Sequence, residues 1–275
     1  MYSQRRYILI AGFRRGGTNI AWNLLQSHPA VTSPILELGE LCWHSRMLRA
    51  ALNGSCVYQT GIRRLMASRS LYKWNMKTLA HPDNRYKSHC ELYTRRELLK
   101  TEMCLKAVDD EIRFGPILAQ LFPGLRVISL VRNGHSLCEG HLRRGSDVDA
   151  FAKIYLSVAN SFKDLSAHGV PVRMIKFEDM IDDPFATAAE MLRFLKIEPS
   201  SLDRIRLKSK RVMRSDGEHE LKFGEEDRKA WFDRQDILTV LDNEVNNAQR
   251  ARLTSDQVRR FDSIAHEAME FFGYD

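Results

Sequence analysis

Residues 7–31 read YILIAGFRRGGTNIAWNLLQSHPAV, and this stretch decides the fold. It begins with a short and nearly all-apolar run from Tyr7 to Ala11, which is typical of a parallel strand buried on both faces. A glycine-containing loop follows at residues 12–19, and apolar residues then recur at helical spacing until Pro29 ends the element. The stretch therefore predicts a strand, a tight loop and a helix.

The same alternation of strand and helix continues along the chain. We expect strands at residues 105–108, 126–131 and 172–177, and helices at residues 112–122, 151–168, 184–195 and 255–272, with a further helix that begins near His135. Strands that alternate with helices favour a parallel sheet with right-handed crossovers. The predicted fold class is therefore α/β, with a parallel central sheet flanked by helices.

Length and composition are those of an ordinary globular domain. The chain has 275 residues, of which 44% are hydrophobic and 28% charged, and this balance excludes wholesale disorder. We find no internal repeat and no long linker, so residues 1–275 are expected to form a single domain. No apolar run approaches the roughly 20 residues that span a bilayer, and the first strand begins too early to leave room for a signal peptide.

The cysteines and the charge indicate a cellular setting and a kind of ligand. The five cysteines are scattered and form no CxxC pair, which favours a reducing, cytoplasmic compartment over a disulfide framework or a zinc site. Lys and Arg exceed Asp and Glu to give a net charge of +7, which suits an anionic ligand. Aromatic residues are not interleaved with the basic ones in a stacking pattern, so we expect no nucleic-acid partner.

The loop has the glycine spacing of a phosphate-binding loop but lacks the residues of a kinase. Thr18 stands where a Walker A loop has its lysine, and Asn19 stands where that loop has its magnesium-binding hydroxyl. A cation, Arg15, lies inside the loop instead, which suits an anionic group that needs no metal. A plain strand-to-helix turn is the alternative interpretation of the loop alone.

Three segments, in order, resemble the sulfotransferase family. Residues 12–31 are similar to its 5′-phosphosulfate loop, GxPRSGTTxLxxLLxxHPxV. Residues 121–144, LFPGLRVISLVRNGHSLCEGHLRR, are similar to its 3′-phosphate region, and residues 170–197 are similar to a later segment with a strand, an acidic pair and a helix. The resemblance is greatest to the carbohydrate-type members, and it implies a P-loop NTPase-like fold.

The resemblance implies a donor, a reaction and a set of donor-binding positions. The donor would be 3′-phosphoadenosine 5′-phosphosulfate (PAPS), whose sulfuryl group moves to an acceptor hydroxyl or amine without a metal. The implied donor-binding positions are Arg14, Arg15, Gly16, Gly17, Thr18, Asn19, Arg132 and Gly140. Four of them depart from the family pattern: Arg14 replaces a proline, Gly16 a serine, Asn19 a threonine and Gly140 a serine. Gly140 stands where the family has the serine that binds the 3′-phosphate.

The resemblance also implies catalytic candidates. Arg15 would neutralise charge on the leaving group, and Arg132, directly after a predicted strand, would bind the 3′-phosphate. Glu37 is the first choice for the base and Glu40 the second, while ordinary helix-face carboxylates are the alternative for both. A histidine, as in the cytosolic branch of the family, is a further candidate for the base. Lys106 lies within an apolar strand, where it either approaches the sulfuryl group or extends along a strand edge to water.

The acceptor site is expected in two less regular segments, residues 42–102 and 209–236. The basic and aromatic residues of the first are Arg63, Arg64, Arg69, Lys73, Trp74, Lys77, Arg85 and Lys87. This mixture suits a carbohydrate or glycoconjugate. Two other functions remain open at this point: a P-loop phosphotransferase or kinase, and a non-catalytic basic protein that binds anionic ligands.

Overall fold

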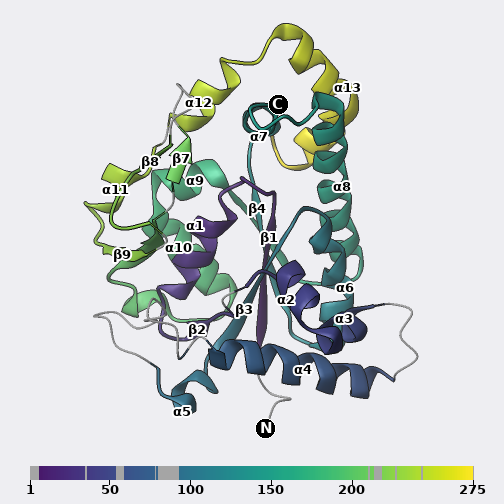
Figure 1. The fold of residues 1–275 in the computed structure, drawn as a ribbon, viewed down its shortest axis with the longest axis vertical. Helices are drawn as coiled ribbons and strands as arrows, with labels where there is room; N and C mark the ends of the chain where they lie inside the picture. Colours follow the sequence, from purple (N-terminus) through teal and green to yellow (C-terminus); the bar gives the residue numbers. More distant parts are fainter. Residues whose placement is uncertain are drawn as a thin grey trace.

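The computed structural model contains a five-stranded, wholly parallel sheet in the order β2-β3-β1-β4-β5 (Figure 1). It describes residues 6–34, 36–53, 59–77, 79, 93–209, 211–213, 219–226, 228–242 and 244–274. The strands are β1 (Tyr7–Gly12), β2 (Val31–Thr32), β3 (Glu102–Val108), β4 (Arg126–Val131) and β5 (Val172–Lys176). The predicted α/β class, with a parallel sheet flanked by helices, is confirmed.

The register of the central strands positions the site. β1 lies between β3 and β4, and Gly12 at its end pairs with Val108 on one side and Leu130 on the other. The three strands therefore end at nearly the same level. The loop after β1 and the residues after β3 and β4 meet at one edge of the sheet, where open α/β sheets bind their ligands.

Alternating side chains of β1 pack into two separate cores, one on each face of the sheet. Leu9 and Ala11 belong to one core, and Ile8 and Ile10 to the other. The first core is covered by α2 (Leu38–His44), α3 (Arg46–Leu52), α4 (Thr60–Lys77), α6 (Gly115–Leu121), α8 (Val148–Ala167) and α13 (Ser255–Phe271). The second is covered by α1 (Thr18–Gln26), α9 (Phe177–Asp182), α10 (Pro184–Phe194) and β6 (Ile205–Lys208).

Shorter elements complete the described chain. They are α5 (Arg95–Leu98), α7 (Gly134–Leu142), α11 (Ile237–Val240), α12 (Val245–Arg250), β7 (Arg211–Met213), β8 (His219–Leu221) and β9 (Lys229–Phe232). β9 pairs with β6 and β8 with β7, both antiparallel. Within the described ranges, no helix is both long and apolar enough to cross a membrane.

Two expectations about secondary structure need correction. The helix expected at residues 112–122 is split, because a 3-10 turn at Asp109–Phe114 precedes α6 and Pro116 stands at the start of that helix. Helix α9 was not expected, since it follows β5 without an intervening loop. Its first residue, Phe177, is buried in the second core, and its ring lies against Gly17 in the loop between β1 and α1.

We predict that Gly17→Ala destabilises the protein more than Gly124→Ala does. Both glycines have a left-handed backbone, with φ of 88° and 94°, so both substitutions incur backbone strain of about 1–2 kcal/mol. A Cβ on Gly17 would also lie 2.4 Å from the Phe177 ring, whereas a Cβ on Gly124 meets nothing within 4 Å. Urea unfolding of the two variants measures the difference, and equal losses of free energy would contradict this packing of the loop against α9.

Candidate active site

The loop between β1 and α1 is anchored from both sides and presents its backbone to the edge of the sheet. The Phe13 ring is buried and stacks on Tyr155, with 4.6 Å between ring centroids. The Arg14 N–H donates to Oδ1 of Asp109 at 2.9 Å. The first N–H groups of α1 have no acceptor within the helix, and the helix dipole adds positive potential there. This arrangement is suited to bind a phosphate or sulfate group.

A cavity of about 350 Å³ opens above the loop. It is lined by Arg14, Arg15, Gly17, Thr18, Asn19, Glu37, Lys106 and Val108. The structure therefore brings together five of the expected donor-binding positions and three of the expected catalytic residues, Arg15 being in both sets. Gly16 is not in the lining, and its N–H donates to the carbonyl of Phe13 at 3.0 Å.

The loop side of this cavity carries an excess of positive charge. Partial burial and the neighbouring charges of Arg144 and Arg14 lower the pKa of Arg15. Arg14 has a compensating carboxylate, since its Nε lies 3.6 Å from Oδ2 of Asp109. Guanidinium groups that lie close together repel one another, and an entering anion relieves this repulsion and lowers the free energy of the site. The cavity therefore favours a multiply charged anionic ligand.

Lys106 is held inside the site by two oxygen atoms. Its side chain is 1% exposed, and Nζ lies 2.5 Å from Oε1 of Glu37 and 2.5 Å from Oδ1 of Asn19. Burial lowers the pKa of Lys106, and the charge of Glu37 opposes this shift. The alternative in which Lys106 extends along a strand edge to water is wrong, because β3 lies inside the sheet and the ammonium ends at the cavity.

The two candidate bases have different environments. Glu37 immediately precedes α2, and its carboxylate lines the cavity beside Lys106. Glu40 lies one turn later, and its carboxylate accepts the N–H of Glu37 at 2.9 Å. Glu40 thus holds the backbone that carries Glu37. Among the described residues that line the cavity, Glu37 is the only carboxylate and no histidine is present.

Two carboxylates near this site were not predicted from the sequence. Asp109 and Glu111 follow β3 directly, and burial raises the pKa of both groups. Asp109 has a left-handed backbone, with φ of 52°, and holds the phosphate loop through Arg14. The rule that directed attention to Arg132, namely that residues just after strand ends line the ligand crevice, also applies to these two residues.

Arg132 follows β4 as expected, but its guanidinium is covered by protein atoms. Nε donates to Oδ1 of Asn246 at 2.7 Å, Nη1 donates to the carbonyl of Arg15 at 3.0 Å, and Nη2 donates to Oε1 of Gln249. The group also lies over the Phe177 ring, 4.2 Å from its centroid. Burial lowers the pKa of Arg132 to about 10. In this conformation protein groups occupy the guanidinium, and the binding of a 3′-phosphate by Arg132 stays a prediction.

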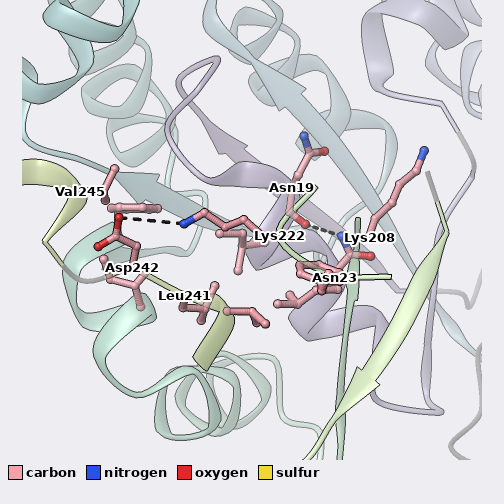
Figure 2. Close-up of a pocket in the computed structure, with 13 residues that line it drawn as sticks. Asn19, Asn23, Lys208, Lys222, Leu241, Asp242 and Val245 are labelled. Carbon is pink, nitrogen blue, oxygen red and sulfur yellow. Dashed lines mark hydrogen bonds and ion pairs between the residues drawn. The ribbon is translucent and has the colours of Figure 1, made fainter. Parts of the chain in front are cut away.

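A second cavity of about 240 Å³ adjoins the first at Asn19, which lines both (Figure 2). Most of its wall is apolar and comes from α1, α9, β6 and the segment around α11, with Ile20, Phe177, Leu207, Phe223, Leu241 and Val245 among its lining residues. Lys222 and Asp242 face each other in Figure 2, with 4.0 Å between Nζ and Oδ2. This cavity suits a flat, largely apolar ring.

Two of the basic residues expected at an acceptor site in residues 42–102 bind backbone carbonyls instead. Arg63 donates to the carbonyl of Ala51, and Arg64 to the carbonyl of Leu121, so both brace neighbouring helices. Both belong to α4, which in Figure 1 lies across the end of the sheet where β1 begins. Arg85 and Lys87 lie outside the described residues. In the part of the chain that the structure covers, no group of His, Cys, Asp and Glu is arranged to hold a metal ion.

Comparisons with known proteins agree with the resemblance. The sequence profile of the sulfotransferase family matches residues 7–201. The sulfotransferase domain from the Synechococcus PCC 7002 olefin synthase is 16% identical, with a TM-score of 0.52 over 95% of this chain and 94% of that chain. The sulfotransferase domain from the curacin biosynthetic pathway is 14% identical, with a TM-score of 0.51 over 94% of this chain and 96% of that chain. These two likenesses show the fold, and a search of curated proteins finds no match.

We predict that Asp109→Asn raises the free energy of unfolding at neutral pH relative to the wild type. Because burial raises the pKa of Asp109 above its ordinary 3.8, the folded protein binds this proton more tightly than the unfolded chain does. The stability contributed by this group therefore falls as the pH rises above 3.8. Asparagine keeps an oxygen acceptor for the Arg14 N–H and tolerates the left-handed backbone.

Urea unfolding of both proteins at several pH values checks this prediction. The difference in free energy of unfolding, variant minus wild type, should grow as the pH rises from 3.8 to neutrality. A difference that shrinks over this range would show that the Asp109 carboxylate gains more from Arg14 than it loses by burial.

Proposed function

The chain belongs to the sulfotransferase family, and from that membership we propose that it transfers a sulfuryl group from PAPS to a hydroxyl or amine of a carbohydrate or glycoconjugate. The observation that carries the proposal is the cavity above the loop, which expected donor-binding and expected catalytic residues line together. It combines a cationic loop with the ion pair between the buried Lys106 and the partly exposed Glu37. An anion site beside a carboxylate is what transfer of a negatively charged group to a protic acceptor requires.

The two adjoining cavities support the placement of the donor. The loop side, with Arg15 and the first N–H groups of α1, fits the 5′-phosphosulfate. The apolar cavity beyond Asn19 fits the adenine ring. When bound, the donor supplies an activated sulfuryl group on a phosphate leaving group. Thr18 and Asn19 replace the lysine and the metal-binding hydroxyl of a kinase loop, so the phosphotransferase alternative lacks its main groups.

The cations would stabilise the leaving group. Arg15 and Lys106 both line the cavity, from the loop and from β3 respectively. Asn19 accepts a hydrogen bond from Lys106 and so fixes its ammonium above the start of α1. Positive charge fixed in advance at this point lowers the energy of the negative charge that develops there during transfer.

Glu37 would accept the proton of the acceptor group. Its side chain is partly exposed, at 32%, whereas its partner Lys106 is buried, so the carboxylate is the member of the pair that an entering acceptor reaches. The ion pair fixes the orientation of both side chains before the acceptor binds. General base catalysis of this kind contributes about 10²- to 10⁴-fold to the rate.

The proposal of a carbohydrate acceptor rests on α2, the helix that directly follows Glu37. α2 begins just after Glu37 and carries Trp43 near its end, with the indole 78% exposed. Six residues of helix rise by about 9 Å, a distance that an oligosaccharide can bridge. An exposed indole offers an apolar face with a polar edge, which supports a sugar ring as the bound group.

We also propose a cytoplasmic location. Cys42, Cys104 and Cys138 are free thiols within the described chain, and all three are buried. Burial raises the pKa of Cys42 and of Cys138 to about 12. Free thiols of this kind persist in a reducing compartment, which supports the cytoplasmic location.

We predict that Glu37→Gln lowers kcat by about 10²- to 10⁴-fold, while Glu40→Gln changes kcat little. Glutamine at position 37 cannot accept the proton, whereas glutamine at position 40 keeps an oxygen that can accept the N–H of Glu37. The assay follows labelled sulfate from PAPS into a panel of acceptors: a neutral oligosaccharide, an anionic oligosaccharide, a phenol and a long-chain alcohol.

Binding of adenosine 3′,5′-bisphosphate, measured by calorimetry, is the control for donor affinity, and Glu37→Gln should not weaken it. A large loss of kcat in Glu40→Gln alone would assign the base to Glu40. Transfer to the phenol or the alcohol, with none to either sugar, would contradict the carbohydrate acceptor.

A further inference from the structure

Helix α12 covers Arg132 with neutral groups. Asn246 and Gln249 lie one turn apart on this helix, and their amide oxygens accept hydrogen bonds from Nε and Nη2 of Arg132. The Arg132 side chain is buried with these amides against it. When the direct acceptors of a buried cation are uncharged, an anion that replaces one of them forms a stronger, charge-assisted hydrogen bond. The geometry thus presents an anion site that is closed by the protein's own side chains.

The residue at position 140 fits this closure. Gly140 lies on α7, and a Cβ built there would be 3.1 Å from Nε2 of Gln249. A serine at this position, as in the family pattern, would press on the Gln249 amide. The absence of a side chain at Gly140 therefore makes room for Gln249, and this departure from the pattern is explained by a residue more than a hundred positions further along the chain.

α12 is a short helix held by polar contacts: Asn246 donates to Oε1 of Glu178, the Ser136 hydroxyl donates to the Asn246 carbonyl at 3.1 Å, and Arg132 donates to Asn246 and Gln249. Its six residues are too few for a helix that is stable by itself. It is flanked by two polar contacts, Lys222 with Asp242 at 4.0 Å before the helix and Arg252 with Glu139 at 2.6 Å after it. In Figure 1, α12 lies at the end of the molecule toward which β1 and β4 run. The helix is therefore a small element placed over the donor side of the sheet.

We propose that Gln249 gates the 3′ end of the donor site. Its amide oxygen occupies on Arg132 the place of an oxygen of the donor's 3′-phosphate, and donor binding displaces Gln249 and moves α12. This inference rests on the proposed function, because it takes PAPS as the donor. Donors that carry the 3′-phosphate gain the Arg132 contact but must first open α12, so their apparent affinity is reduced by the cost of opening.

The test compares two ligands that differ only in the 3′-phosphate. Calorimetry gives the affinities of adenosine 3′,5′-bisphosphate and adenosine 5′-phosphate for the wild type and for Gln249→Ala. Since this variant removes the competing amide, it should raise the preference for the bisphosphate by about tenfold, the range expected for a hydrogen bond to a charged group. Asn247→Ala is the matched control, because this neighbour on α12 is exposed and its side chain bonds to Glu244 in the described part of the chain, not to Arg132.

Two further measurements do not depend on the folding of Gln249→Ala. Gly140→Ser pushes Gln249 away and supplies a hydroxyl, so it should also raise the preference for the bisphosphate. In the wild type, the amides of residues 245–250 should exchange hydrogen faster when the bisphosphate is bound, whereas adenosine 5′-phosphate should leave their exchange unchanged.

Each outcome bears on a different claim. An unchanged or lower preference in both variants, with slower exchange in α12, would show that Gln249 is a fixed part of the fold and would overturn the gate. Binding of the bisphosphate to the wild type in that case would leave the proposed function standing. No binding of the bisphosphate to any of these proteins would overturn the proposed function, and the gate with it.

Discussion

The parallel register of β1 between β3 and β4 is the constraint on which the rest of the structure depends. Because Gly12 pairs with Val108 and with Leu130, the chain leaves all three strands at one level. Asp109 then contacts Arg14, and Arg132 contacts Arg15, although both partners lie far from the loop in the sequence. The two cores on either face of the sheet hold this register, and a shift of one strand would separate the loop from its partners.

Burial of Lys106 is an energetic cost of this site. A lysine with almost no exposed surface is unfavourable unless its charge is compensated. Glu37 and Asn19 compensate it, and the Trp22 ring adds a cation–π contact with 4.8 Å between Nζ and the ring centroid. The same contacts orient the ammonium toward the cavity, so the groups that make the buried charge tolerable also place it for chemistry.

The sequence predicted those parts of the molecule whose signals are local. The apolar run at residues 126–131 matches the bounds of β4, and the loop at residues 12–19 is recognised by its glycines and its place between strand and helix. The cover over Arg132 could not be predicted, because Asn246 and Gln249 lie 114 and 117 residues beyond Arg132 and their segment carries no distinctive pattern. Lys106 lies between these cases: the apolar strand around it was recognised from the sequence, but only the fold decides between the site and the strand edge and brings Glu37 to it.

We propose that the loop binds a nucleotide that carries phosphates on both its 3′ and 5′ sides and needs no metal. Thermal unfolding with adenosine 3′,5′-bisphosphate, and separately with ATP and magnesium, tests it most directly. At 100 times its dissociation constant a ligand stabilises the folded state by about 2.7 kcal/mol, a readily measured shift. We expect this stabilisation with the bisphosphate in the absence of metal, and no stabilisation with ATP and magnesium. Stabilisation by ATP and magnesium alone would contradict it and favour a phosphotransferase.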